Sequence, residues 1–81
     1  MKRYLINKSI RTLLGLSGRQ LAERVEVTKQ TISHYEAGRP VNRPTERVIE
    51  IELDLAIEQC VNVELKKICE QLKTQRTGID A

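Results

Sequence analysis

Apolar residues recur at helical spacing near the start of the chain. Between residues 3 and 14 they fall on one side of a helix, and Gly15 marks the end of this predicted helix. Ser17 followed by Gln20 is the capping-box pattern, and it predicts a short helix over residues 18–25. The residues expected to face the core are Ile6, Ile10, Leu13 and Leu14 in the first helix, and Leu21, Ala22 and Val25 in the second.

A second helix start follows closely. The hydroxyl of Thr28 can cap a helix over residues 29–37, which Gly38 and Pro40 end. Only residues 26–28 separate this helix from the one before it, and so short a link holds the two helices at a steep angle. The sequence therefore predicts a helix-turn-helix. The inward-facing residues of its second helix are Ile32 and Tyr35.

The second half of the chain has helical patterning throughout. Pro44 begins a helix predicted over residues 44–59, whose apolar residues cover most of its circumference and predict burial on more than one side. Beyond it, an apolar stripe steps by three and four positions, with charged residues on the other face. No Pro or Gly interrupts residues 45–77, so one long helix and two helices broken near Asn62 are both open. The stripe consists of Ile57, Val61, Leu65, Ile68 and Leu72.

This stripe is expected to form a dimer interface. A domain that is complete near residue 57 leaves little of its own surface to cover the stripe, so a second subunit is the economical cover. Packing against the first helix of the same chain is the alternative. The expected organisation is a domain over residues 1–57, an amphipathic helical dimerisation segment over 58–77 and a tail over 78–81, with fraying from residue 75.

Composition narrows the class of protein. The chain has 81 residues, enough for one small domain. Its 40% apolar and 31% charged residues, with two Tyr and neither Phe nor Trp, indicate an all-α protein with an aliphatic core. No apolar run exceeds three residues, which excludes a membrane span, and the first residues lack the apolar stretch of a secretion signal. We therefore expect a cytoplasmic protein.

The sequence carries no motif for catalysis, metal binding or disulfide formation. One His and two Cys do not make a zinc site, and there is no phosphate-binding loop or nucleophile elbow, so we expect no enzyme, no metal and no cofactor. Cys60 and Cys69 are nine positions apart on a predicted helix. They would lie on opposite faces and roughly 13 Å apart along its axis, too far for a disulfide. Both are expected to be free thiols.

Charge is distributed unevenly, although the net charge is only +3. Residues 1–43 hold nine Lys and Arg against three acidic residues, whereas residues 44–81 hold five against eight. A basic half joined to an acidic half suggests a protein that binds a polyanion at one end, but ordinary solvated charge gives the same distribution. The sequence of the basic half must therefore decide between the two.

The predicted helix-turn-helix resembles a known family. The segment LSGRQLAERVEVTKQTISHYEAGR is similar to that of the lambda-repressor-like, Cro/cI-type (XRE) regulators, and the likeness covers about residues 3–57. Glu26 departs from the pattern, because the family often has a turn Gly there, and a residue other than Gly is strained if its φ is positive. Gly18 stands where many members have a Gln that contacts DNA phosphate. The matching positions are Ala22 at the helix contact, Val27 in the turn, Ile32 in the second helix and Glu36 to Arg39 at its end.

A polar face of the helix over 29–37 is predicted to read DNA. In the second helix of this motif such a face enters the major groove, where Gln suits adenine and Lys suits guanine. The residues predicted to read bases are Lys29, Gln30, Ser33 and His34, and those predicted to bind phosphate are Arg19, Thr28, Arg39 and Arg43. The resemblance also implies a structural ion pair between Arg11 and Glu36.

The predicted function is sequence-specific binding of double-stranded DNA by a transcriptional regulator. We expect a repressor that reads an inverted-repeat operator as a homodimer and acts by occupying a promoter. The resemblance leaves open a phage or mobile-element repressor, a restriction–modification controller and the antitoxin of a toxin–antitoxin pair. In the antitoxin alternative the stripe over residues 57–77 binds a partner protein and lacks order without it. A protein adaptor without DNA binding is a further alternative, against which the polar residues between 29 and 34 argue.

Overall fold

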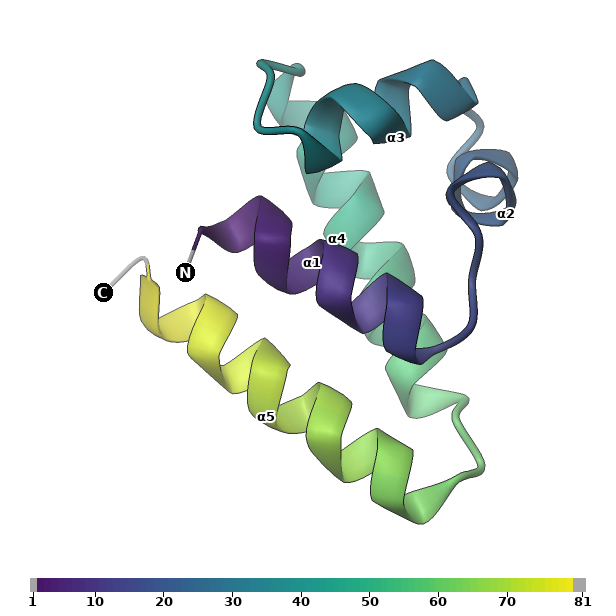
Figure 1. Cartoon of the computed structure of the whole chain (residues 1–81), viewed down its shortest axis with the longest axis vertical. Coiled ribbons are helices and arrows are strands. Elements are labelled where there is room, and N and C mark those ends of the chain that lie inside the picture. The colour runs from purple at the N-terminus through teal and green to yellow at the C-terminus, as the bar shows by residue number, and fades with distance from the viewer. Residues whose placement is uncertain (1, 80–81) are drawn as a thin grey trace.

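Five helices make up the fold. The computed structural model of the chain describes residues 2–79, and no strand occurs among them. The helices are α1 (Arg3–Leu13), α2 (Gly18–Arg24), α3 (Lys29–Glu36), α4 (Arg43–Glu58) and α5 (Val63–Ile79) (Figure 1). This confirms the predicted all-α bundle of four to five helices with a helix-turn-helix.

The side chains that cap the helices explain where several of them begin. Ser17 and Gln20 form the predicted capping box of α2, and the Thr28 hydroxyl accepts from the Thr31 N–H at the start of α3. The Asn42 side chain caps α4 in the same way. Asn62 Oδ1 accepts from the Leu65 N–H (3.0 Å), and residues 59–62 are not helical. The chain therefore forms two C-terminal helices, which settles the question that the sequence left open.

The core lies around α1, which is in contact with helices on several sides. α1 runs between the α2–α3 pair on one side and α5 on the other, and α4 passes behind it (Figure 1). Leu13 is 39% exposed, so the predicted inward stripe of α1 does not extend to it. The buried apolar residues are Ile6, Ile10, Leu21, Ala22, Val25, Ile32, Tyr35, Ile49, Leu53, Ile57 and Cys69.

The C-terminal stripe packs largely inside its own chain, which corrects the predicted dimer interface. Ile57 is only 2% exposed and belongs to the core, and Leu65 and Leu72 pack against that core. Val61 and Ile68 remain exposed. The other three residues are covered because the chain turns back at residues 59–62, so that α5 lies along α1. The sequence had suggested that the chain has too little surface of its own to cover them.

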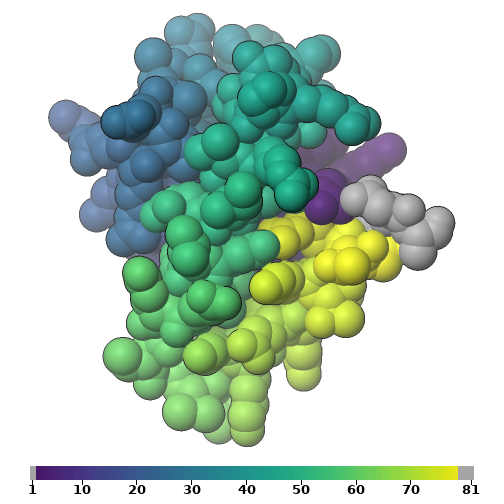
Figure 2. Space-filling view, turned by 180° about the vertical axis from the view of Figure 1, so that it is seen from behind, coloured from purple at the N-terminus to yellow at the C-terminus, as the bar shows by residue number. Residues whose placement is uncertain are grey.

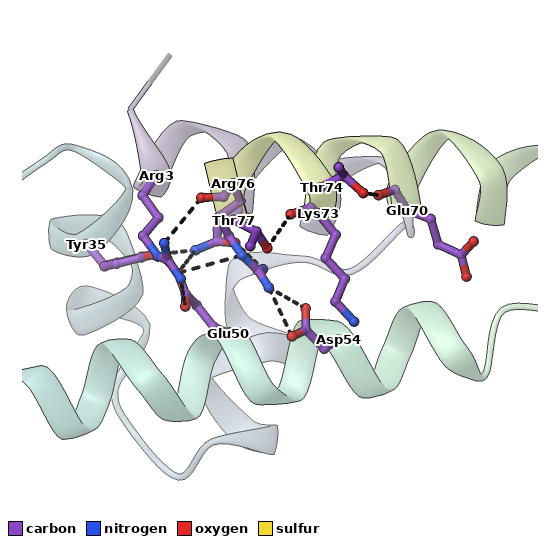
Figure 3. Close-up of polar contacts among 10 residues, drawn as sticks. Arg3, Tyr35, Glu50, Asp54, Glu70, Lys73, Thr74, Arg76 and Thr77 are labelled. Atoms are coloured by element: carbon purple, nitrogen blue, oxygen red, sulfur yellow. Dashed lines mark hydrogen bonds and ion pairs between the residues drawn. The ribbon is translucent and has the colours of Figure 1, made fainter. Parts of the chain in front are cut away.

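A buried arginine joins α5 to the rest of the domain (Figure 3). Arg76 is 4% exposed, and its Nη2 donates to both oxygens of Asp54 on α4 (2.7 and 2.9 Å). Its Nη1 donates to Oδ1 of Asn7 on α1 (2.8 Å). The prediction of fraying from residue 75 was therefore wrong, because these bonds hold the last turns of α5. Of the predicted tail over 78–81, residues 78 and 79 are helical and residues 80–81 lie outside the described residues.

Asn7 extends this link to α3. It is buried, and its Nδ2 donates to the Tyr35 hydroxyl (2.6 Å) and to Glu50 Oε2 (2.9 Å). Arg3 donates to both oxygens of Glu50, with Nη2 2.8 Å from Oε1, and to the backbone carbonyl of Arg76 (3.3 Å). One connected set of polar groups thus joins α1, α3, α4 and α5.

The charge state of this network follows from its contacts. Burial acts to raise the pKa of Glu50, but hydrogen bonds from Arg3 and Asn7 and the charge of Arg76 outweigh it and hold that pKa below its ordinary value. Burial raises the pKa of the Tyr35 hydroxyl. At neutral pH Glu50 is therefore an anion, and the Tyr35 hydroxyl is neutral and accepts the Asn7 hydrogen bond.

Both cysteines are free, as expected, but for a different geometric reason. Cys60 lies in the loop between α4 and α5 and Cys69 lies within α5, so they do not share the single helix on which their separation was predicted. Burial, more than the nearby Cys60, raises the pKa of the Cys69 thiol. Within residues 2–79 no helix is long and apolar enough to cross a membrane, and no cluster of three or more His, Cys, Asp or Glu is suited to a metal ion.

Candidate nucleic-acid interface

α2 and α3 pack tightly across each other. Leu21 and Ala22 on α2 and Ile32 on α3 are buried, and a Cβ added at Gly18 would meet Ile32 at an ordinary contact distance of 3.8 Å. Gly18 is therefore not required by packing at this crossing. The small side chain of Ala22 lies among the buried residues where the two helices meet.

The turn between these helices contains a strained residue. Glu26 has φ 57°, the only positive φ of a residue other than Gly among residues 2–79. The Val27 N–H donates to the Ala22 carbonyl (3.0 Å), which is the bond that closes a helix end around a left-handed residue. This conformation is the one that the family's turn Gly adopts without cost, so the departure seen in the sequence has a structural consequence.

Glu26→Gly is expected to raise the free energy of unfolding by about 0.5–1 kcal/mol. Relief of left-handed strain contributes about 1–2 kcal/mol, and the greater freedom of Gly in the unfolded chain offsets about half of it. Urea denaturation followed by circular dichroism measures the change. Glu23→Gly inside α2, where φ is negative, is the matched control and should destabilise. A loss of stability for Glu26→Gly would contradict the strain.

The outward face of α3 carries the residues predicted to read bases. Lys29, Gln30 and Ser33 are exposed, and His34 is half-buried. Within residues 2–79 the side chains of these four residues make no hydrogen bond or ion pair with the protein. The structure therefore brings the four together on one helix face, with the polar ends of at least three of them available to a ligand.

The C-terminal end of α3 is held against α1 by polar contacts. Arg11 donates to both oxygens of Glu36 (2.6 and 3.0 Å) and to the Leu16 carbonyl (2.6 Å), which confirms the ion pair that the resemblance implied. Tyr35 accepts from Asn7, as described above. α3 is thus held by two polar links as well as by Ile32, and its reading face has a defined orientation.

Sequence reasoning missed the part that Asn7 plays. An Asn beside Ile6 on an apolar helix face reads as a gap in the stripe, and nothing local shows that its partners are on α3, α4 and α5. Arg24 on α2 also has a distant partner, because it lies 3.4 Å from Glu52 on α4 in a partly exposed ion pair.

The residues predicted to bind phosphate lie on α2, at the start of α3, in the loop after α3 and at the first residue of α4. Arg19 is on α2, 80% exposed and 3.5 Å from Glu23, whereas Arg39 and Arg43 are exposed in and after the loop that follows α3 (Figure 1). Thr28 lies at the start of α3, where its hydroxyl caps the helix. Three exposed Arg side chains thus lie on the elements directly before and after α3. Phosphate contacts from such side chains position a protein on a duplex without reading its sequence.

Comparison with known proteins agrees with this geometry. A family model described as helix-turn-helix matches residues 8–51, more than half of the chain. The chain belongs to this family, that of the lambda-repressor-like (XRE) regulators. No curated protein and no solved structure matches the chain significantly. The matched segment runs from the middle of α1 to the middle of α4 and includes every residue predicted to contact DNA. The helix-turn-helix family is one of DNA-binding regulators, and α5 lies outside the match.

Proposed function

We propose that this regulator represses transcription by reading an inverted-repeat operator as a homodimer, with α3 of each copy in a major groove. One observation carries the proposal: the four side chains on the outward face of α3 have no partner within residues 2–79, while the opposite face of the helix is anchored through Ile32, Tyr35 and Glu36. A fixed helix with unengaged polar side chains is suited to hydrogen bonding with base edges.

The division of labour between side chains follows from their chemistry. Gln30 offers an amide that fits adenine N6 and N7, and Lys29 is a donor to guanine O6 and N7. Arg19, Arg39 and Arg43 supply charge to phosphates without reading sequence. A dimer bound in this way represses by occupying a promoter.

The partner-binding alternative finds less support. The antitoxin reading needs the stripe over residues 57–77 to be open for a partner protein, but Ile57, Leu65 and Leu72 pack inside the chain. This packing therefore favours the DNA-reading function.

Gln30→Ala is expected to weaken binding to the selected operator by about 1–3 kcal/mol and to relax preference at one base position. Arg43→Ala is expected to weaken binding to all sequences and to lower the salt slope by about one unit. The operator is first selected from a random duplex pool. Fluorescence anisotropy with the selected and a scrambled duplex, at several salt concentrations, then measures both effects.

Two matched variants control this experiment. Gln71→Ala removes an exposed Gln from α5, and Lys67→Ala removes an exposed basic residue from the same helix. Both should bind the two duplexes as the unmodified protein does. If Gln30→Ala lowers affinity for the selected and scrambled duplexes equally, α3 is not the reading helix.

A further inference from the structure

The outer face of α4 is apolar and uncovered. Ile49, Leu53 and Ile57 are buried on the inner face, whereas Val48, Ile51 and Leu55 on the outer face are 45%, 49% and 44% exposed. Figure 2 shows the surface of the molecule opposite to the view of Figure 1, with α4 running along it in teal to green. Three large aliphatic side chains on one exposed helix face form a contiguous apolar patch, and such patches often mark a site where another protein binds.

The spacing and the flanking charges of this face have a definite pattern. Positions 48, 51 and 55 follow the three-and-four spacing of a helix that packs against another helix. At 100° per residue, Arg47 and Glu52 lie on opposite flanks, each about 70° around α4 from the middle of the face. Glu52 also lies 3.4 Å from Arg24 of its own chain, and Glu58 lies on the same flank as Arg47 near the end of α4. Arg47 and Glu52 are therefore the charges that flank the middle of the apolar strip.

We propose that this face binds a second copy of the chain, with the two α4 helices parallel about a two-fold axis. The proposal rests on the homodimeric function proposed above and names the surface that makes the dimer. Parallel pairing sets the Arg47 edge of each copy against the Glu52 edge of the other, five positions further along, which is the charge pairing that flanks parallel helix seams. A two-fold interface uses the same surface on both copies, and the outer face of α4 meets this condition because its charges are complementary to those of a second copy.

The direction of pairing agrees with DNA reading. α3 lies at the N-terminal end of α4, and Val27 of the turn and Tyr35 lie beside Thr45 and Glu46 on the first turns of α4. Two parallel α4 helices therefore place both reading helices at the same end of the dimer. An antiparallel pair would place them at opposite ends, where they could not read one duplex, and would bring Arg47 near Glu58 instead.

The first experiment compares two Lys substitutions at equally exposed isoleucines. Ile51→Lys on α4 is expected to weaken self-association about tenfold or more, measured by sedimentation equilibrium from micromolar to millimolar concentration. Ile68→Lys on α5 is the matched control, because Ile68 is 47% exposed and belongs to the stripe that the sequence proposed as the interface. It should leave association unchanged. Because both side chains are exposed, both variants should fold, and circular dichroism melting checks this.

A charge exchange tests the pairing itself. Arg47→Glu and Glu52→Arg should each weaken association, because each sets like charges against one another twice in the dimer. Glu52→Arg also sets an Arg against Arg24 within the chain, so circular dichroism melting checks the fold of every variant. The double variant Arg47→Glu with Glu52→Arg should recover it to within about threefold. Recovery by Arg47→Glu with Glu58→Arg instead would overturn the parallel arrangement.

Other results would refute the proposal that the outer face of α4 is the dimer interface, whatever the direction of the two helices. A monomer at millimolar concentration, an Ile51→Lys variant that associates normally, or an equal loss in Ile68→Lys would each do so. Binding to a duplex with one half of the selected operator is measured in parallel and should be the same for Ile51→Lys and the unmodified protein. Failure of the unmodified protein to bind that half-site would count against the proposed DNA-reading function, whereas normal half-site binding without the dimer would count against the α4 face alone.

Discussion

Arg76→Leu is expected to lower the free energy of unfolding by about 3–5 kcal/mol, because it removes one partner from a buried set of charges. Asp54 loses both of its hydrogen bonds from the guanidinium, and Asn7 loses the donor to its Oδ1. Leu is shorter than Arg and supplies no donor, so the buried Oδ1 of Asn7 and the partly exposed carboxylate of Asp54 both lose these hydrogen bonds. Urea denaturation followed by circular dichroism gives the change directly.

A control for charge removal is available on the same helix. Lys67 is exposed on α5, and Lys67→Leu should change stability by less than about 0.5 kcal/mol. Arg76→Lys keeps the charge but not the two-pronged bond to Asp54, so it should lie between Arg76→Leu and the unmodified protein. A loss below about 1 kcal/mol for Arg76→Leu would mean that the pair contributes no more than a surface ion pair.

Gly38→Ala is expected to cost about 1.5–4 kcal/mol of stability, the sum of two separable effects. The φ of Gly38 is 81°, which a residue with a Cβ adopts at about 1–2 kcal/mol. The lower freedom of Ala in the unfolded chain offsets about half of this cost and leaves about 0.5–1 kcal/mol. A Cβ there would also lie 2.7 Å from the Tyr4 hydroxyl oxygen, so the Tyr4 ring must shift, and overpacking of this kind costs about 1–3 kcal/mol. Thermal or urea unfolding measures the total.

Gly15→Ala separates the two effects. Gly15 ends α1 with φ 75°, but a Cβ there would have nothing within 4 Å, so this variant carries the backbone strain alone. It should therefore cost only about 0.5–1 kcal/mol. Equal losses at the two positions would show that Tyr4 yields freely and that only the backbone conformation matters at Gly38.

Local signals in the sequence were sufficient to predict the helix-turn-helix. Ser17 and Thr28 cap the helices where they were expected, and Gly15 and Gly38 both have the positive φ that ends a helix. These signals work because a cap involves backbone groups only two or three residues away, so the sequence carries both partners together. The outward position of Lys29, Gln30 and Ser33 follows from the same local periodicity, and their contacts with DNA bases stay a prediction.

The C-terminal helix shows where such reasoning fails. An apolar stripe indicates that one face of a helix is buried against another surface. It does not indicate whether that surface belongs to the same chain or to a second copy. Leu65 and Leu72 pack within the chain because Asn62 starts a new helix and reverses its direction. Arg76 was placed in a frayed tail because its partner Asn7 lies 69 positions away, beyond the reach of any periodicity.

The contact between α1 and α5 also has a consequence for the order of events during synthesis. α1 is made first, yet the surface that it shares with Cys69 and Arg76 can be completed only after the chain has been translated past residue 76. At about 5–20 residues per second, roughly 2–7 seconds pass between the making of Arg43 and Arg76. During that interval the matched helix-turn-helix segment has nearly all of its own residues but exposes one side of α1. A nascent chain stalled before residue 76 should therefore be open to proteases and chaperones even though its DNA-reading helix has already been made.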